Sequence, residues 1–190
     1  MNNQLKVTVY LGDIVCQDDC DVIVSSSNMD MSECLGVCGA IHRAAGPELE
    51  DFTSKLPPLK VGDAVLTPGF RLKQSGIIHV CGPSYHFDSE PERYLSLVVE
   101  KSLRLANENG FTKIALPAIS MGIFAFPWTQ GIPIMVNAVV AIRDEIKNLQ
   151  EVRFVVLTQE LKEIFDREVD TKIGLFTSKK IFSKYPLCDK

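Results

Sequence analysis

Residues 21–47 read DVIVSSSNMDMSECLGVCGAIHRAAGP, and this stretch decides the fold class. Its first part, Val22-Ile23-Val24, is β-branched and has no polar alternation, which is typical of a strand covered on both faces. A polar, turn-rich segment follows over residues 25–35, and from Gly36 the apolar residues recur at the spacing of one helix face. The stretch therefore predicts a strand, a loop and a helix, in that order.

The junction between this loop and this helix has the features of an anion site. The first N–H groups of a helix have no intrahelical acceptor, and the helix dipole places positive charge behind them. Phosphate groups bind at such positions. Gly36 and Gly39 lack a Cβ atom and so allow a ligand to approach the backbone closely. The sequence thus predicts a phosphate site where this helix begins.

The length and composition fit one globular domain. The chain has 190 residues, of which 46% are hydrophobic and 23% charged, and this is enough for a substantial core. No stretch approaches the roughly 20 apolar residues that span a bilayer, and the first ten residues, MNNQLKVTVY, lack the apolar run of a signal peptide. We therefore expect an intracellular protein, cytoplasmic or nuclear, with reduced cysteines and no membrane partner.

The net charge and the cysteine spacing bear on whether the chain binds nucleic acid or zinc. The formal net charge of −4 argues against a general nucleic-acid binder, which usually has a basic face. Ligand phosphates would then be held by backbone amides. Two evenly spaced pairs, Cys16 with Cys20 and Cys34 with Cys38, leave a zinc site open as an alternative. Zinc ribbons favour C-x2-C spacing and this chain has core enough without a metal, so we expect none.

Strands and helices alternate along the whole chain. A strand near a sheet edge is expected over residues 5–11. Two further strands, over 63–67 and 76–80, could pair as a hairpin. The last two strands are expected over 113–116 and 152–157. The first helix bends or ends at Gly46-Pro47. A second helix is expected to run from a capping box at Ser89 to a glycine C-cap at Gly110. Two more helices are expected over 132–146 and near 160–167. This order predicts an α/β fold, a three-layer α/β/α sandwich with a mixed, largely parallel central sheet.

Ligands of such sheets bind at the carboxyl ends of the strands. Three loops leave those ends, at residues 12–14, 27–39 and 117–127. We expect the domain to cover residues 1–169, and residues 170–190 to form a C-terminal extension that is either a docked tail or a linker.

Four motifs in this framework resemble the macrodomain family: GDI at residues 12–14, GVCGAIHRAAGPEL at 36–49, IIHVCGP at 77–83 and ALPAISMGIFAFP at 115–127. They occur in the family's order over about residues 7–169. The closest likeness is to MacroD-type domains and to macrodomains attached to mono-ADP-ribosyltransferases. The resemblance implies a module that binds ADP-ribose, and some members hydrolyse ADP-ribose from proteins, nucleic acids or its O-acetyl ester.

The resemblance also implies partners. The ligand would be free ADP-ribose or an ADP-ribosylated protein, and nucleic acid would enter only as an ADP-ribosylated substrate. We expect no cofactor, and we expect a monomer.

The family's adenine and ribose contacts fall on three residues. Asp13 would accept a hydrogen bond from the adenine amine, and the Ile14 amide would meet the ring nitrogen. The alternative is that Asp13 caps a turn. Asn28 matches the last residue of the family's NAAN motif, whose amide contacts the distal ribose, and it is the one candidate catalytic residue. As a loop asparagine, it could equally serve a turn.

Two loops would hold the diphosphate. In the first, Gly36 precedes three residues whose backbone N–H groups would face it: Val37, Cys38 and Gly39. The second loop matches the family through five consecutive residues: Ser120, Met121, Gly122, Ile123 and Phe124. Gly122 would admit a phosphate and Phe124 would pack against the distal ribose, although a phenylalanine at a loop tip is as often part of the core.

Several positions depart from the family pattern. The NAAN motif appears as Ser25-Ser26-Ser27-Asn28, and the glycine run before the helix appears as Cys34-Leu35-Gly36. Met121 stands where Thr or Ser is common, and Ala125 where Gly is. The acidic residue of MacroD-type hydrolases is replaced by Cys38, a thiol that is mostly neutral at cellular pH.

These departures favour a binding module with weak or absent hydrolysis. The alternative is a hydrolase that removes ADP-ribose from acidic side chains or deacetylates O-acetyl-ADP-ribose. A Cys38 nucleophile with His42 as its base is a further alternative. However, His42 lies in the family's IHRAAG string, where its usual role is structural, and we expect His79 to be a satisfied histidine of the core or sheet edge.

Overall fold

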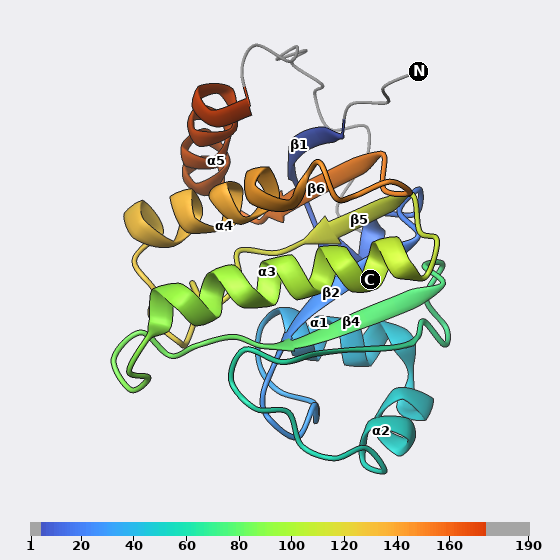
Figure 1. Cartoon of the computed structure of the whole chain (residues 1–190). Helices are drawn as coiled ribbons and strands as arrows, with labels where there is room; N and C mark the ends of the chain where they lie inside the picture. The colour runs from blue at the N-terminus through green and yellow to red at the C-terminus, as the bar shows by residue number, and fades with distance from the viewer. Residues whose placement is uncertain (1–4, 174–190) are drawn as a thin grey trace.

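Strand β2 (Val22–Ser27) lies inside a six-stranded sheet, in a computed structural model that describes residues 5–173 (Figure 1). It pairs in parallel with β4 (Gly76–Cys81) on one side and with β5 (Lys113–Leu116) on the other. Its first three residues are completely buried, as their β-branched run predicts. The strand order is β1-β6-β5-β2-β4-β3.

The outer strands complete a mixed sheet. Strand β1 (Lys6–Leu11) forms one edge and pairs in parallel with β6 (Glu151–Val156), which in turn pairs in parallel with β5. Strand β3 (Ala64–Pro68) forms the other edge and is antiparallel to β4. The predicted edge strand, the predicted hairpin and the largely parallel centre are all confirmed.

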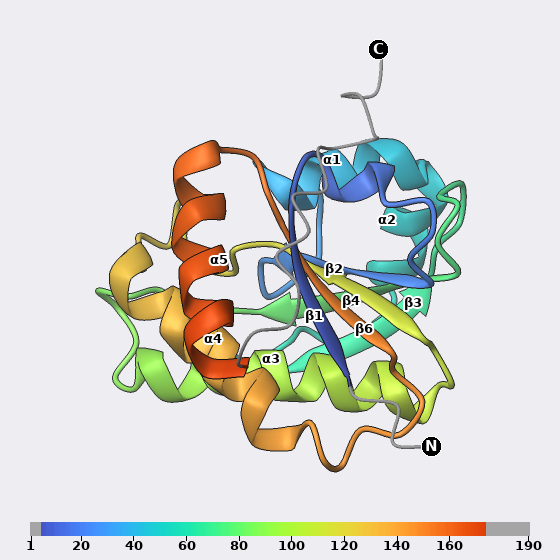
Figure 2. The ribbon, with the colours of Figure 1, turned by 90° about the horizontal axis from the view of Figure 1, so that it is seen from above.

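Helices cover both faces of the sheet, so the three-layer sandwich is confirmed (Figure 2). One face carries α3 (Pro91–Glu108), α4 (Trp128–Ile142) and α5 (Gln159–Ile173). The other carries the short 3-10 helix η1 (Ile14–Cys16), α1 (Val37–Ala45) and α2 (Pro47–Thr53). Alternate residues of β2 enter the two cores: Val22 and Val24 pack under α3 and α4, and Ile23 packs under α1.

Some predicted boundaries are wrong. Strand β2 continues through Ser27, because its backbone pairing with β4 runs on to the pair Ser27 and Cys81. The buried Ser27 hydroxyl is satisfied by bonds to Ser25 and to His79. Helix α3 has no capping box, since it begins at Pro91 and its N-cap is Glu90, one residue after the serine that we expected. Helix α4 begins and ends about four residues before the predicted range.

The described domain ends later than the sequence predicts, and one cysteine is oxidised. Helix α5 runs to Ile173, past the expected end of the domain at residue 169, and the rest of the expected extension lies outside the described residues. Cys20, Cys34, Cys38 and Cys81 are free thiols. Cys16 is disulfide-bonded, so the expectation of reduced cysteines is wrong for this residue. Within residues 5–173, no helix is both long and apolar enough to cross a membrane.

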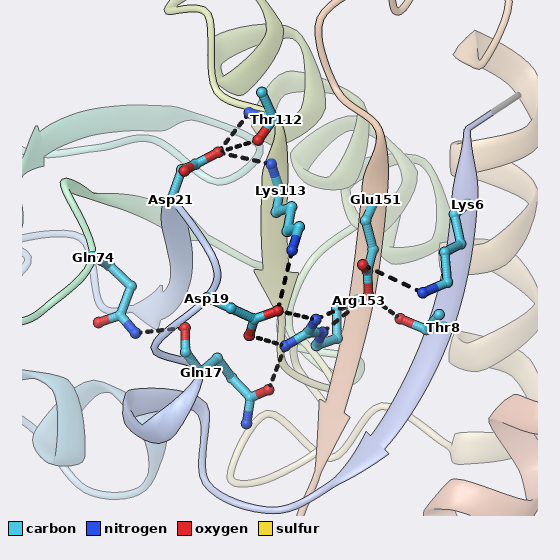
Figure 3. Close-up of polar contacts among 10 residues, drawn as sticks. All are labelled: Lys6, Thr8, Gln17, Asp19, Asp21, Gln74, Thr112, Lys113, Glu151 and Arg153. Carbon is cyan, nitrogen blue, oxygen red and sulfur yellow. Dashed lines mark hydrogen bonds and ion pairs between the residues drawn. The ribbon is translucent and has the colours of Figure 1, made fainter. Parts of the chain in front are cut away.

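A buried arginine connects three strands and the loop after η1 (Figure 3). The side chain of Arg153, in β6, is only 2% exposed, yet all five of its N–H donors are used. They bond to Asp19 in a bidentate pair at 2.7 and 2.9 Å, twice to Glu151 at 3.1 Å, and to Gln17 at 3.0 Å. The guanidinium also lies 4.2 Å from the ring centroid of Tyr10 in β1.

Other groups complete this network. Glu151 also accepts a bond from Thr8 of β1 and pairs with Lys6, and Lys113 of β5 pairs with Asp19 at 3.3 Å. The hydrogen bonds from Arg153, together with the nearby Lys113, hold the pKa of the Asp19 carboxyl well below its usual range. Polar side chains therefore fix this face of β1, β6 and β5 where no helix of the described chain covers it, as Figure 2 shows.

Replacing Arg153 by Met tests this network. The change leaves the Glu151 carboxylate buried without its main partner, so we expect the free energy of unfolding to fall by about 3 kcal/mol, as for one broken buried pair. Urea denaturation at pH 7 would measure it. Asp19→Asn should cost less, because more than a third of the Asp19 side chain is exposed.

The Asp19→Asn variant also allows the pH dependence of the stabilisation by Asp19 to be measured. Because the pKa of Asp19 is lowered in the folded state, its stabilising effect is present above the unfolded pKa near ~4 and is lost as pH falls below it. The stability difference between the unmodified chain and Asp19→Asn should therefore shrink from pH 7 toward pH 3. A constant difference would contradict the assignment.

Candidate functional site

The candidate site lies at the carboxyl ends of the parallel strands, which we call the carboxyl edge. Strands β2 and β5 are direct neighbours, so the loops that follow them leave the sheet side by side. The loop after β1 lies at the same edge, two strands beyond β5, and the Gly12 N–H joins it to the end of β6 through a 2.9 Å bond to Val156. The sheet thus brings together the three loops predicted from sequence.

Asp13 is the N-cap of η1. One carboxylate oxygen accepts a 3.1 Å bond from the Val15 N–H, and the backbone carbonyl of Asp13 accepts a 2.9 Å bond from the Gln17 side chain. The turn-capping alternative for Asp13 is therefore observed. The cap uses one oxygen, which leaves the second oxygen as a possible acceptor for a ligand.

The loop after β2 presents three backbone donors. Gly36 is the N-cap of α1 with a φ of 72°, a left-handed conformation that favours glycine. The first bond of the helix ladder runs from Ala40 to the Gly36 carbonyl at 3.0 Å. The N–H groups of Val37, Cys38 and Gly39 therefore precede the ladder and have no intrahelical acceptor. This is the anion-binding geometry that the sequence predicts.

Gly39 has a different reason to be glycine. A Cβ atom built there would lie 2.0 Å from the carbonyl oxygen of Cys34, because residue 34 folds back over the first turn of α1. At Gly36 and Gly122, in contrast, a Cβ would meet nothing within 4 Å. The close approach at Gly39 therefore serves the packing of the loop, and the open space at Gly122 is available to a ligand.

The side chains of Asn28 and Cys38 are both tied to Ser32. The Asn28 side chain donates to the Ser32 hydroxyl at 2.9 Å and accepts from the Ser32 N–H at 3.1 Å, so the turn alternative for Asn28 is observed. The Cys38 thiol is fully buried and donates to the Ser32 carbonyl at 3.3 Å. Burial raises the pKa of Cys38 to about 12, so the thiol stays neutral and is a poor acid or base.

Ser32 is thus a residue of the site that sequence reasoning missed. The spacing Asn28-x3-Ser32 was the available signal, since asparagine side chains commonly bond to the backbone a few residues away.

The loop after β5 is held in a strained form. Ser120 and Ala125 have φ values of 63° and 54°, which non-glycine residues rarely adopt. Ala125 occupies a position where the family commonly has glycine, and its backbone keeps the conformation that glycine favours. The Ser120 hydroxyl is buried with no hydrogen-bond partner in the described chain. A Cβ at Gly82, in the IIHVCGP motif, would lie 2.4 Å from that hydroxyl, so the two loops pack closely here.

The tip of this loop carries free donors. The N–H groups of Gly122, Ile123 and Phe124 have no backbone acceptor within residues 5–173. Met121 differs: its N–H bonds to the Ala118 carbonyl at 3.3 Å, and its side chain, 8% exposed, packs in the core. The Phe124 carbonyl accepts a 3.0 Å bond from the Tyr85 N–H, which joins this loop to the one after β4.

The histidines do not form a catalytic arrangement with Cys38. His79 is completely buried, with its ring nitrogens 3.2 Å from the Ser27 hydroxyl and 3.1 Å from the Thr67 hydroxyl, so the expected structural role is confirmed. Burial lowers the pKa of His79 to about 3, which keeps the ring neutral. His42 directs Nδ1 at Glu50, 3.2 Å away. Among the described residues, no cluster of three or more His, Cys, Asp or Glu has a metal-binding arrangement.

This fold and this edge, with two glycine-containing loops that present backbone donors, define the macrodomain class. The Macro domain family model matches residues 24–135, more than half of the chain. The chain belongs to the macrodomain family.

Relatives and solved structures agree with this assignment. An O-acetyl-ADP-ribose deacetylase of Klebsiella pneumoniae is 36% identical over 84% of this chain and 93% of its own length. A Macro domain-containing protein of Mesorhizobium japonicum is 34% identical over 86% of this chain and 93% of its own. The Oceanobacillus iheyensis macrodomain with ADP matches with a TM-score of 0.85 and 26% identity, over 90% of this chain and 93% of that one. A Trypanosoma brucei macrodomain in complex with ADP-ribose matches with a TM-score of 0.79 and 25% identity, over 86% and 68%.

Gly39→Ala tests the packing of the first loop, and Gly122→Ala is its matched control. The new Cβ at residue 39 must displace the Cys34 backbone, so we expect a loss of about 1–3 kcal/mol in the free energy of unfolding, typical of overpacking. The same change at residue 122 meets open space and should leave the melting temperature within about 2 °C of the original. Equal melting temperatures for the two variants would contradict this account.

Proposed function

We propose that this chain binds ADP-ribose at the carboxyl edge of its sheet. The observation that carries the proposal is that two adjacent loops, after β2 and β5, each present three backbone N–H groups without acceptors in the described chain. A diphosphate needs several donors of this kind, and backbone donors suit a chain with a net charge of −4. Family members with ADP and with ADP-ribose support the choice of ligand.

We assign the ends of the ligand by position. Asp13 accepts from the adenine amine with its second carboxylate oxygen, and the Ile14 N–H meets the ring. The diphosphate lies between the N–H groups of residues 37–39 and those of residues 122–124. Phe124 packs on the distal ribose, beside Asn28, whose amide must exchange its bonds to Ser32 if it contacts a ribose hydroxyl.

We infer that the main activity is recognition. The side chain in place of the family's acidic residue, Cys38, is buried, neutral and bonded to Ser32, so it cannot orient a water at the distal ribose. The partners are free ADP-ribose and mono-ADP-ribosylated proteins, in the cytoplasm or nucleus, and the chain acts as a monomer.

A second candidate function is hydrolysis of an ADP-ribose ester. The observation in its favour is the 36% identity to a relative named O-acetyl-ADP-ribose deacetylase. A substrate phosphate can assist such a reaction in place of a protein acid. Against it, Cys34 and Leu35 place side chains where the family's glycines allow the distal ribose to approach the backbone.

Calorimetry with free ADP-ribose tests the binding site. We expect a micromolar Kd, about −8 kcal/mol, and a loss of roughly 1.5–3 kcal/mol on Asp13→Ala, the range for a hydrogen bond to a charged group. Asp18→Ala is the matched control, since Asp18 lies in the same loop but is exposed and pairs with Lys73. No heat at millimolar ligand would refute the proposal, and equal affinities of the two variants would move the adenine elsewhere.

Single-turnover release of ADP-ribose from a glutamate-modified protein tests the recognition assignment. The unmodified chain should be slower than an acid-containing hydrolase by about 10²–10⁴-fold, the usual cost of losing a positioned acid or base. The triple variant Cys34→Gly, Leu35→Gly and Cys38→Asp should release faster, provided that its circular dichroism shows a folded chain. Rapid release by the unmodified chain would assign it as a hydrolase.

A further inference from the structure

The exposed hydrophobic side chains gather at the carboxyl edge. Among residues 5–173, six large hydrophobic side chains are exposed, and five of them lie in loops after β2, β4, β5 and β6: Met29, Leu35, Phe87, Ile123 and Leu157. The sixth, Phe52, lies in α2 and contacts the ring of Phe70. Hydrophobic residues scattered singly over a surface are normal, whereas a concentration around one site indicates contact with a partner.

Folding leaves most of the surface of three of these side chains exposed to water. Phe87 is 91% exposed, Leu35 82% and Ile123 79%. Burial of such a side chain is worth about 1.5–3 kcal/mol, and the folded chain leaves that free energy unused at all three positions. Leu35 also replaces a glycine of the family pattern, so its apolar side chain is an addition that this chain makes at the edge of the site.

These three residues lie on loops that the proposed function places around the diphosphate and distal ribose. Leu35 immediately precedes Gly36, the N-cap of α1, and Ile123 immediately precedes Phe124. The loop with Phe87 is joined to the same Phe124 by the bond from the Tyr85 N–H, and its Gly82 packs against Ser120. Leu157 lies elsewhere, because it follows β6 beside Gly12 and Asp13, at the adenine end of the proposed site.

The loops after β2 and β5 offer no charged side chain to a partner at this place, because residues 34–39 and residues 117–127 contain no Asp, Glu, Lys or Arg. The loop after β4 does carry charge, since Asp88 accepts a 2.7 Å bond from the Ser84 N–H and Glu90 pairs with Arg93. A charged segment seated on the loops after β2 and β5 would lose water without gaining a counter-charge there, which is unfavourable, whereas an apolar segment would bury its surface against the exposed side chains.

We propose that Leu35, Phe87 and Ile123, the apolar rim, dock apolar side chains that flank the ADP-ribosylated residue of a protein partner. The proposal rests on the proposed function, because a protein attached to the distal ribose must lie against whatever surrounds that end of the ligand. The rim then selects which modified proteins are bound, while the backbone donors bind the ADP-ribose itself.

Matched peptides test this specificity. Two synthetic eleven-residue peptides would carry ADP-ribose on the central residue through a non-hydrolysable linkage, one flanked by Leu, Val and Phe and the other by Gly and Ser. Calorimetry would compare both with free ADP-ribose. We expect the apolar peptide to bind about tenfold tighter than the Gly/Ser peptide, and the Gly/Ser peptide to match free ADP-ribose within about twofold.

Variants assign the preference to the rim. Phe87→Ser and Leu35→Ser should each lower the ratio of the two peptide affinities about threefold, and together should bring it close to one. Leu157→Ser is the matched control: it removes another exposed leucine, 67% exposed against 82% for Leu35, at the adenine end of the same edge and should leave the ratio unchanged. The ratio cancels any effect of Leu35 on ADP-ribose itself.

The outcomes separate the two proposals. Failure of free ADP-ribose to bind would overturn the proposed function and this inference with it. Binding of free ADP-ribose with equal affinity for the two peptides would overturn the inference alone. Sedimentation that shows a dimer for the unmodified chain and a monomer for Phe87→Ser would also overturn it, because a second copy would then cover the rim.

Discussion

The parallel pairing of β2 with β5 and β4 is the constraint on which the rest of the structure depends. Because parallel strands require crossover connections, the helices must return the chain over the faces of the sheet, and the loops after β2 and β5 must leave the same edge. Complete burial of Val22, Ile23 and Val24 between two helical layers holds this pairing in place. The site is therefore a consequence of sheet topology.

The candidate site uses the backbone more than side chains. Donors from the first turn of α1 and from the loop at residues 122–124 carry no formal charge, yet helix geometry and the left-handed conformations of Gly36 and Ser120 orient them. Asn28 and Cys38, which stands where MacroD-type hydrolases have an acidic residue, are both held by Ser32. In the proposed function, this arrangement separates binding from catalysis: the backbone donors are left for the ligand, while the Asn28 amide is occupied and Cys38 offers no acidic group.

Polar interactions hold the part of the sheet where the hydrophobic cores end. Arg153, Asp19 and Glu151 join β6, the loop after η1 and, through Thr8 and Lys113, the strands on either side (Figure 3). An arginine can do this at low exposure only because all five of its donors are satisfied. Gln17, which accepts a bond from Arg153, donates a 2.9 Å bond to the Asp13 carbonyl, so the network also helps to fix the position of the proposed adenine contact.

The sequence by itself determined the fold class, the order of most strands and helices, and the three loops of the site. It could do so because the spacing of hydrophobic residues, β-branched runs and turn residues are local signals. The macrodomain resemblance rests on motifs of the same local kind. Only the tertiary structure decided that Asn28 and Cys38 bond to Ser32, that Gly39 faces the Cys34 carbonyl, and that exposed side chains from separate loops gather at one edge. These contacts depend on side-chain direction and on the packing of segments distant in the chain, which no local pattern encodes.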